Sequence, residues 1–367
     1  GKSNTTGLSN TFIGNSTGLD NTLGLENTFM GFAAGSNNTT GDGNVFIGVN
    51  TGGNSTMADN NTFVGTYSGV LNTTGTNNTY LGEHAGFANT TGSRSTFLGQ
   101  NAGAAHTNSS DNTFVGYGAG SNSTGGAFNT FLGVNSGVNT TAGSNTFIGH
   151  RSGEANTFGS ANTFLGYNSG IVNAGGYDNT FVGASAGGFN LSGDQNVFIG
   201  HASGFTNTEG DENVYIGDEA AFSTTTADFN VCIGRQSGVN VTSGSNNTFV
   251  GYKTGGSVTD DAHNTFIGSE AGELSTGIEN TYVGGLAGQC NDSGNQNTFV
   301  GYEAGSLSTA TSSTFLGRSA GRLTTGTANT FVGNNSGQVN TTGFANVFFG
   351  SFAGGSNTTG NNNLFMG

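Results

Sequence analysis

Asn10-Thr11-Phe12-Ile13-Gly14 is the stretch that decides the fold, because close copies of it recur along the whole chain. The motif occurs 22 times in 367 residues, and its aromatic residue is spaced by 17 positions, with four steps of 16. A short, strict period of this kind is the sequence signature of a solenoid, in which each repeat forms one coil and stacks on the next. We number the coil from this motif, so that Asn10 is position 1 and Gly14 is position 5.

The residue types at these positions favour a short strand between two turns. Position 2 is mostly Thr, position 3 is aromatic in all but one coil, and position 4 is always apolar, which suits a strand. Glycine is invariant at position 5 and nearly so at position 9, as corners with positive φ or close backbone approach require. We therefore expect two or three short strands per coil and no helix. The first corner glycines are Gly14, Gly31, Gly48, Gly65 and Gly82.

The repeat predicts an all-β fold: a parallel β-solenoid, or β-roll, of about 22 coils with 16–17 residues each. Stacking of like residues would set the register, with an amide ladder at position 1 and a ring ladder at position 3. At roughly 4.8 Å per coil, the coils would form a rod on the order of 105 Å long. The amide ladder begins with Asn10, Asn27, Asn44, Asn61 and Asn78. The ring ladder begins with Phe12, Phe29, Phe46, Phe63, Tyr80, Phe97, Phe114, Phe131, Phe147, Phe164, Phe181 and Phe198.

The regular period also bears on domain organisation. It leaves no boundary, so residues 1–367 are expected to form one continuous repeat domain without separate caps. Gly1 falls at position 9 and Gly367 at position 5, so the ends could nearly continue one another. We expect either a fragment of a longer chain or a unit that stacks head to tail.

Composition and charge exclude several classes of protein. Glycine accounts for 69 residues, but it has no three-residue period and proline is absent, which excludes collagen. The 29 Phe and 9 Tyr sit mostly on the repeat, unlike the sequence of a disordered chain. A net charge of −15 argues against nucleic acid or an anionic membrane as a partner, and no apolar run is long enough to span a bilayer. Cys232 and Cys290 lie more than three coils apart, too far for a disulfide.

Positions 3 and 4 pose a problem, because adjacent strand residues point to opposite faces and both positions are apolar. Only one of them can fill the coil, so the other leaves an apolar stripe along the solenoid. We expect the stripe to pack against another copy of the chain. The preferred arrangement places the aliphatic position 4 inside and the aromatic at the contact, and the reverse stays open.

The repeat also resembles known families. The pattern Asn-Thr-Phe-Ile-Gly-x-x-Ala/Ser-Gly-x-x-Asn-Thr-Thr-Gly is similar to the 17-residue repeats of phage and bacterial tail-fibre-like proteins. It also resembles the head repeats of trimeric autotransporter adhesins, although those usually carry Ala where this chain has Phe. The resemblance implies a β-roll in a homotrimer or filament, located outside the cell, on a cell surface or on a virion.

The sequence contains no enzyme motif, cofactor motif or metal-ligand cluster. The five histidines occupy scattered coil positions, and Asp260 with Asp261 supply too few oxygens for calcium. We therefore expect no catalytic residue, no cofactor and no metal. Asn-x-Ser/Thr sequons in the more variable segment are possible glycosylation sites; they include Asn4, Asn38, Asn72, Asn89, Asn139, Asn340 and Asn357.

Three functions follow from these features. The first is a non-enzymatic structural fibre or shaft of an extracellular appendage, adhesin or tail fibre. The second is an ice-binding solenoid that uses the Thr column at position 2, which Val45, Val197, Val214, Val231, Val347 and Leu364 interrupt. The third is a rod that binds a cell-surface receptor or glycan through positions 6 and 7, where Tyr117, Tyr167, Tyr252 and Tyr302 occur.

Overall fold

Each coil contributes one three-residue strand, formed by positions 2 to 4 and ended by the glycine at position 5. The computed structural model describes residues 1–367 and contains 22 strands and no helix. The strands are β1 (Thr11–Ile13), β2 (Thr28–Met30), β3 (Val45–Ile47), β4 (Thr62–Val64), β5 (Thr79–Leu81), β6 (Thr96–Leu98), β7 (Thr113–Val115), β8 (Thr130–Leu132), β9 (Thr146–Ile148), β10 (Thr163–Leu165), β11 (Thr180–Val182), β12 (Val197–Ile199), β13 (Val214–Ile216), β14 (Val231–Ile233), β15 (Thr248–Val250), β16 (Thr265–Ile267), β17 (Thr281–Val283), β18 (Thr298–Val300), β19 (Thr314–Leu316), β20 (Thr330–Val332), β21 (Val347–Phe349) and β22 (Leu364–Met366).

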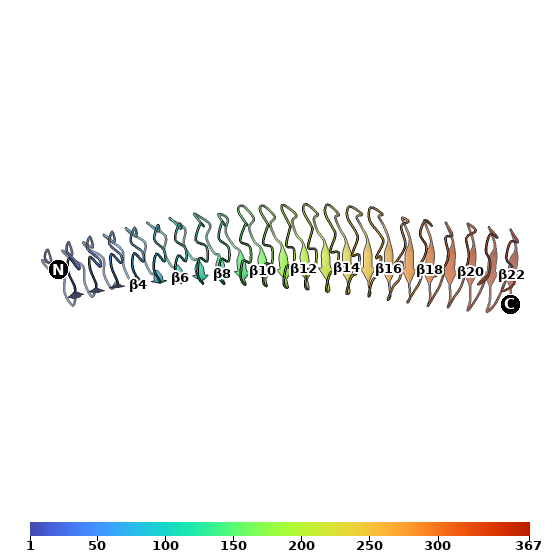
Figure 1. The fold of residues 1–367 in the computed structure, drawn as a ribbon, viewed down its shortest axis with the longest axis horizontal. Helices are drawn as coiled ribbons and strands as arrows, with labels where there is room; N and C mark the ends of the chain where they lie inside the picture. The colour runs from blue at the N-terminus through green and yellow to red at the C-terminus, as the bar shows by residue number, and fades with distance from the viewer. The chain divides into compact units, whose positions relative to one another are not determined.

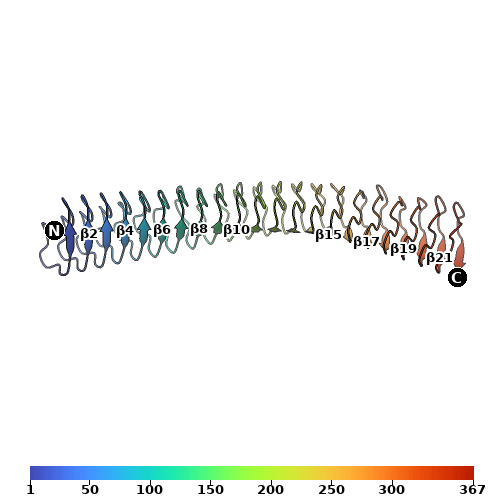
Figure 2. The ribbon, with the colours of Figure 1, turned by 60° about the horizontal axis from the view of Figure 1, so that its bottom comes forward.

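The chain divides into a first unit, Gly1–Ala184, and a second unit, Ser185–Gly367. Within each unit, consecutive strands pair in parallel, and every residue opposes its counterpart one coil on, as Phe12 opposes Phe29 and Phe348 opposes Phe365. Figures 1 and 2 show the strands of each unit side by side, with the turns on the other side of the coil. The predicted all-β parallel β-solenoid of about 22 coils is confirmed. A single continuous domain stays a prediction.

The Asn-Thr-Thr-Gly segment does not form a further strand, so the expectation of two or three strands per coil is wrong. In the first unit, the backbone N–H groups of Thr39 and Thr40 both donate to the carbonyl of Thr56, at 2.9 and 3.1 Å. Two donors that share one acceptor cannot continue into a regular ladder. The backbone of the segment still ties each coil to the next through the carbonyl of position 13, and buried side chains such as Asn38 add a further link.

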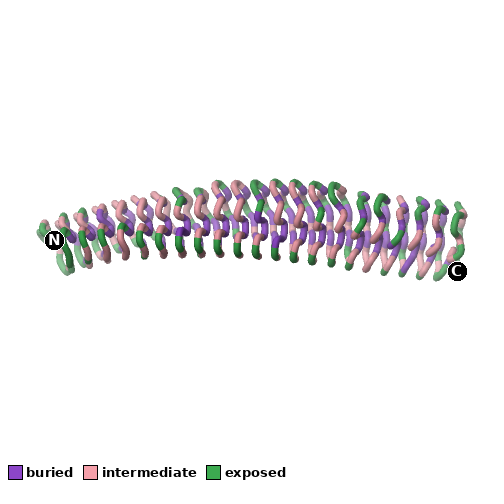
Figure 3. The backbone as a smooth tube through the Cα atoms, viewed as in Figure 1, coloured by how far each residue is buried: buried purple, intermediate pink, exposed green.

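The aromatic position 3 fills the coil, which corrects the preferred placement of position 4 inside. Phe29 and Phe46 are fully buried, and their stacked ring centroids lie 4.8 Å apart. Ile13, at position 4, is 52% exposed. A flat ring stacks at the spacing of the coils and leaves no gap, and burying a large apolar side chain contributes about 1.5–3 kcal/mol. Figure 3 shows the resulting line of buried residues within each unit.

The ring column explains why positions 8 and 9 take only small residues. Ala34 at position 8 is fully buried, and a Cβ on Gly35 at position 9 would lie 2.5 Å from the ring of Phe29. That separation is far below a normal contact distance, so the ring and the second corner are packed against each other. The glycine at position 9 also has a positive φ, 57° at Gly35.

Candidate functional surface

The outward side chains of positions 2 and 4 form a continuous surface in each unit, which we call the strand face. It exists because the aromatic at position 3 points inward, which turns both neighbours outward. In the first unit, position 2 is Thr in every coil except that of Val45. The unbroken run in this unit is Thr62, Thr79, Thr96, Thr113, Thr130, Thr146, Thr163 and Thr180.

The buried asparagines of position 1 hold the strand face in register. Asn27 is fully buried, its backbone N–H donates to Asn10 Oδ1 at 2.9 Å, and its Nδ2 donates to Gly41 O at 2.8 Å. Asn44 repeats the arrangement on Asn27, with N–H to Oδ1 at 2.9 Å. The amides at Asn61 and Asn78 continue the series. Asn27 therefore bonds to the coil before it through its backbone N–H and to the coil after it through its Oδ1, so the strands have little freedom to shift.

Two columns of Thr hydroxyls behave differently. At position 13, the hydroxyls of Thr39 and Thr73 donate to the position 13 carbonyls of the following coils, each at 2.9 Å. The hydroxyls of position 2, such as those of Thr113 and Thr130, point away from the coil and make no hydrogen bond to the protein. The position 13 column is therefore structural, whereas the position 2 column is free to bind water or a ligand.

Charged side chains lie outside the strand face. No charged residue occupies positions 1 to 5 of any of the 22 motif copies. At position 17, Arg94 Nε lies 2.6 Å from Asp111 Oδ1, and this hydrogen bond lowers the pKa of the Asp111 carboxyl below its ordinary value. In the second unit, Arg235 Nε lies 3.3 Å from Asp218 Oδ2 at position 6. The strand face is thus uncharged at its centre and has charged residues along its edges, a distribution that is typical of binding surfaces.

The buried titratable groups belong to the coil interior. Burial raises the pKa values of the Tyr80 hydroxyl and the Cys232 thiol, which keeps both groups protonated. Burial lowers the pKa of the His106 imidazole, whose Nε2 lies 3.1 Å from Ser109 O. Cys290 is also a free thiol, and its pKa is raised by burial and then by nearby carboxylates. None of these groups reaches the strand face.

No three His, Cys, Asp or Glu side chains converge on a site that could hold a metal ion. The Asp260 carboxylate accepts hydrogen bonds from the Ser243 and Thr242 hydroxyls, both at 2.8 Å, which lowers its pKa. Asp261 has a raised pKa because of its burial and its neighbour Asp260. The pair therefore serves local loop structure.

Four of the predicted glycosylation sites point into the coil, so the structure argues against them. Asn38, Asn72, Asn89 and Asn340 are fully buried at position 12. Asn38 Nδ2, for example, donates to Asn21 Oδ1 at 2.7 Å. A glycan on such an amide has no space in a folded coil. The remaining predicted sites, which are not fully buried, are Asn4, Asn139 and Asn357.

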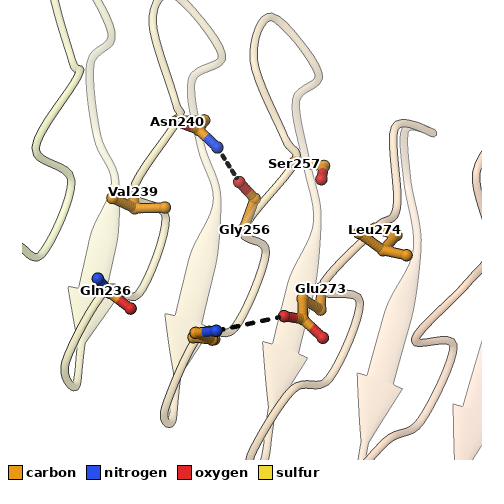
Figure 4. A pocket seen from close by; sticks show the side chains of 8 residues that line it. Gln236, Val239, Asn240, Gly256, Ser257, Glu273 and Leu274 are labelled. Carbon is orange, nitrogen blue, oxygen red and sulfur yellow. Dashed lines mark hydrogen bonds and ion pairs between the residues drawn. The ribbon is translucent and has the colours of Figure 1, made fainter.

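A shallow cavity of about 230 Å³ lies on the turn side of the second unit. It is a notch left by Gly256 at position 10, where neighbouring coils carry Val239 and Glu273 (Figure 4). Lys253 Nζ lies 4.0 Å from Glu273 Oε1, and Asn240 Nδ2 donates to Gly256 O at 2.6 Å. The polar groups of the notch are thus largely engaged with one another.

The tyrosines at position 6 lie on the same turn side and are exposed. Tyr167 stacks on His150 with centroids 5.4 Å apart, and Lys253 Nζ lies 5.5 Å from the ring centroid of Tyr252. Tyr117 and Tyr302 are half exposed. They do not form one continuous column, and receptor or glycan binding through them stays a prediction.

No model of a known protein family matches the chain, and a search of curated proteins finds no match. The resemblance to tail-fibre-like proteins and autotransporter heads therefore depends on the motif alone. What the structure establishes is the parallel β-solenoid with its 17-residue repeat. A helix able to cross a lipid bilayer is not among its elements.

Proposed function

We propose that the protein is a non-enzymatic structural spacer, the shaft of an extracellular appendage, adhesin or tail fibre. The observation that carries this proposal is the uniform use of the coil interior. Every paired strand opposes its neighbour residue for residue, and the buried rings and amides contact their own counterparts one coil away. A coil that contacts only its neighbours adds length without altering the rest of the structure.

Deleting whole coils tests the spacer. Removal of residues 62–112 takes out three coils of 17 residues and joins Asn61 to Thr113, which restores the normal motif. Because adjacent rings lie 4.6–5.1 Å apart in this unit, the variant should fold and lose about 14 Å of its maximum dimension. Small-angle X-ray scattering and negative-stain images measure that dimension.

A matched deletion of residues 62–69 removes eight residues, less than half a coil, and brings unlike positions into register. It should lower the melting temperature strongly, whereas the three-coil deletion should not. A maximum dimension that does not change when three coils are removed would rule out the spacer. Self-association as a homotrimer or head-to-tail filament stays a separate prediction, tested by the mass in solution.

A further inference from the structure

The Thr run of the first unit is an ordered array of unused hydroxyl groups. From Thr62 to Thr180 each coil presents one position 2 hydroxyl that makes no hydrogen bond to the protein. The backbone beneath each one is fixed, since Thr62 N–H donates to Asn78 O at 2.8 Å and the following coils repeat this bond. The spacing of the array is therefore that of the coils, with ring centroids 4.6–5.1 Å apart in this unit.

The aliphatic column beside it supplies a second regular feature. Position 4 residues such as Leu81 and Leu132 are nearly half exposed on the same face as the Thr side chains. Thr is also β-branched, so its methyl and hydroxyl groups occupy few rotamers. The first unit thus displays methyl and hydroxyl groups in a fixed, repeating pattern. These side chains lose little conformational entropy on binding.

A second copy of the chain could satisfy this part of the surface only if its own Thr column lay directly against it. Packing an apolar partner on it would remove eight hydroxyls from water without giving them partners, and burying an unpaired hydroxyl is unfavourable. An occupant that repeats regularly and itself donates and accepts hydrogen bonds avoids this problem. The absence of charge at positions 1 to 5 also means that the occupant need not strip the hydration shell of an ion.

We propose that the strand face of the first unit, from β4 to β11, binds ice. Ice is a regular lattice of water molecules, each both a donor and an acceptor, so it can satisfy every Thr hydroxyl while the methyl and aliphatic groups cover the surface between them. This activity is independent of the spacer function, because it depends on the outward residues and not on the number of coils.

The test uses the full chain and measures thermal hysteresis, the gap between the melting and freezing temperatures of a seeded ice crystal. The wild type should produce a gap and faceted crystals. The double substitution Thr113→Tyr with Thr130→Tyr places two bulky rings in the middle of the run and should abolish most of the gap. Val134→Tyr is the matched control, because it adds a ring at the exposed position 6, where the preceding coil already has Tyr117.

A second set of variants protects the test against misfolding. Thr96→Val, Thr113→Val and Thr130→Val together keep the shape of the side chains, and Val45 shows that the column accepts Val. This triple variant should keep the melting temperature of the wild type and lose part of the hysteresis. Monomeric wild-type protein without hysteresis would overturn the proposal. Hysteresis that survives the double substitution of Thr113 and Thr130 by Tyr would also overturn it. A wild-type protein that is oligomeric, lacks hysteresis and becomes monomeric on this double substitution would do the same.

Discussion

At the scale of single residues, the glycine at position 5 is the least replaceable part of the coil. Gly48 has a φ of 139°, and a Cβ built on it would lie 2.6 Å from Gly65 O in the next coil. Both the backbone conformation and the close approach exclude a side chain. The position lies on the strand side of every coil, so a single change affects the pairing of two neighbouring strands.

We predict that Gly48→Ala lowers the free energy of unfolding by about 2–3 kcal/mol, through backbone strain and the clash with the next coil. Gly125→Ala is the control, since its Cβ would meet only Thr141 O at 3.5 Å and its φ is not positive. That change should stay within about 0.5 kcal/mol. Urea unfolding followed by circular dichroism measures both, and equal effects would contradict the assignment of Gly48 as a corner.

A second prediction at this scale concerns His106, which stands at position 12 where Asn89 stands one coil earlier. Burial lowers its pKa below the ordinary 6.5, so the unfolded chain binds a proton more readily than the folded one. The folded state should therefore lose stability as the pH falls below about 6.5, by at most about 1.4 kcal/mol per pH unit from this group.

The measurement compares His106→Asn with the wild type by urea unfolding between pH 7.5 and pH 5. The variant keeps a residue that position 12 commonly holds, so its fold should be intact. As the pH falls from 7.5 to 5, the unfolding free energy of the wild type should decrease more than that of the variant. A difference that is constant with pH would show that His106 titrates normally in the folded state.

At the scale of elements, neighbouring coils compensate for each other's exceptions. Ala221 replaces the glycine that position 9 has in 20 of 21 coils, and both it and Tyr215, the ring of its own coil, are fully buried. The next coil carries Cys232 in place of a ring, which leaves room beside Tyr215. The ring stacking is less regular after Cys232: the ring planes of Phe249 and Phe266 are inclined to each other by 25°.

We predict that Ala221→Gly and Cys232→Phe are energetically coupled. Cys232→Phe alone overpacks the interior and should destabilise the protein by about 1–3 kcal/mol. With Ala221→Gly in the same chain, the normal coil is restored. The double variant should then be about 1 kcal/mol more stable than the sum of the two single effects predicts. Urea unfolding of the four proteins completes the cycle, and additive effects would mean that the two exceptions are unrelated.

At the scale of the whole molecule, the dominant electrostatic feature is the net charge of −15 carried by 22 acidic and 7 basic residues. Exposed pairs such as Arg94 with Asp111 offset little of this repulsion, because water screens the attraction between charges at the surface. Uncompensated charge of one sign destabilises a folded chain, and salt screens it over about 10 Å at 0.1 M.

The expected outcome is a melting temperature that rises as sodium chloride increases from about 10 mM to 150 mM. Differential scanning calorimetry at neutral pH measures it, and sucrose at matched osmolality controls for a general solute effect. If the melting temperature falls with salt, attractive ion pairs outweigh the net repulsion, and the charge distribution is stabilising.

The repeat allowed the fold to be predicted because each signal in it is local and occurs many times. Gly14 and its counterparts mark a corner, Thr-Phe-Ile marks a strand, and the 17-residue spacing stacks them in register. The buried amides of position 1 follow for the same reason. Local sequence also indicated the Thr column, although it could not show that position 13 hydroxyls are bonded while position 2 hydroxyls are free.

Only the tertiary structure decided which apolar residue of the strand faces inward. Phe12 and Ile13 are both apolar, and alternation alone cannot say which face is the interior. That choice depends on the width of the coil and on rings that stack on the next coil, and those are long-range properties. The left-handed residues at positions 7 and 17, such as Ser16 and Glu26, were missed for a related reason. Their conformation is imposed by closure of the coil and not by their own side chains.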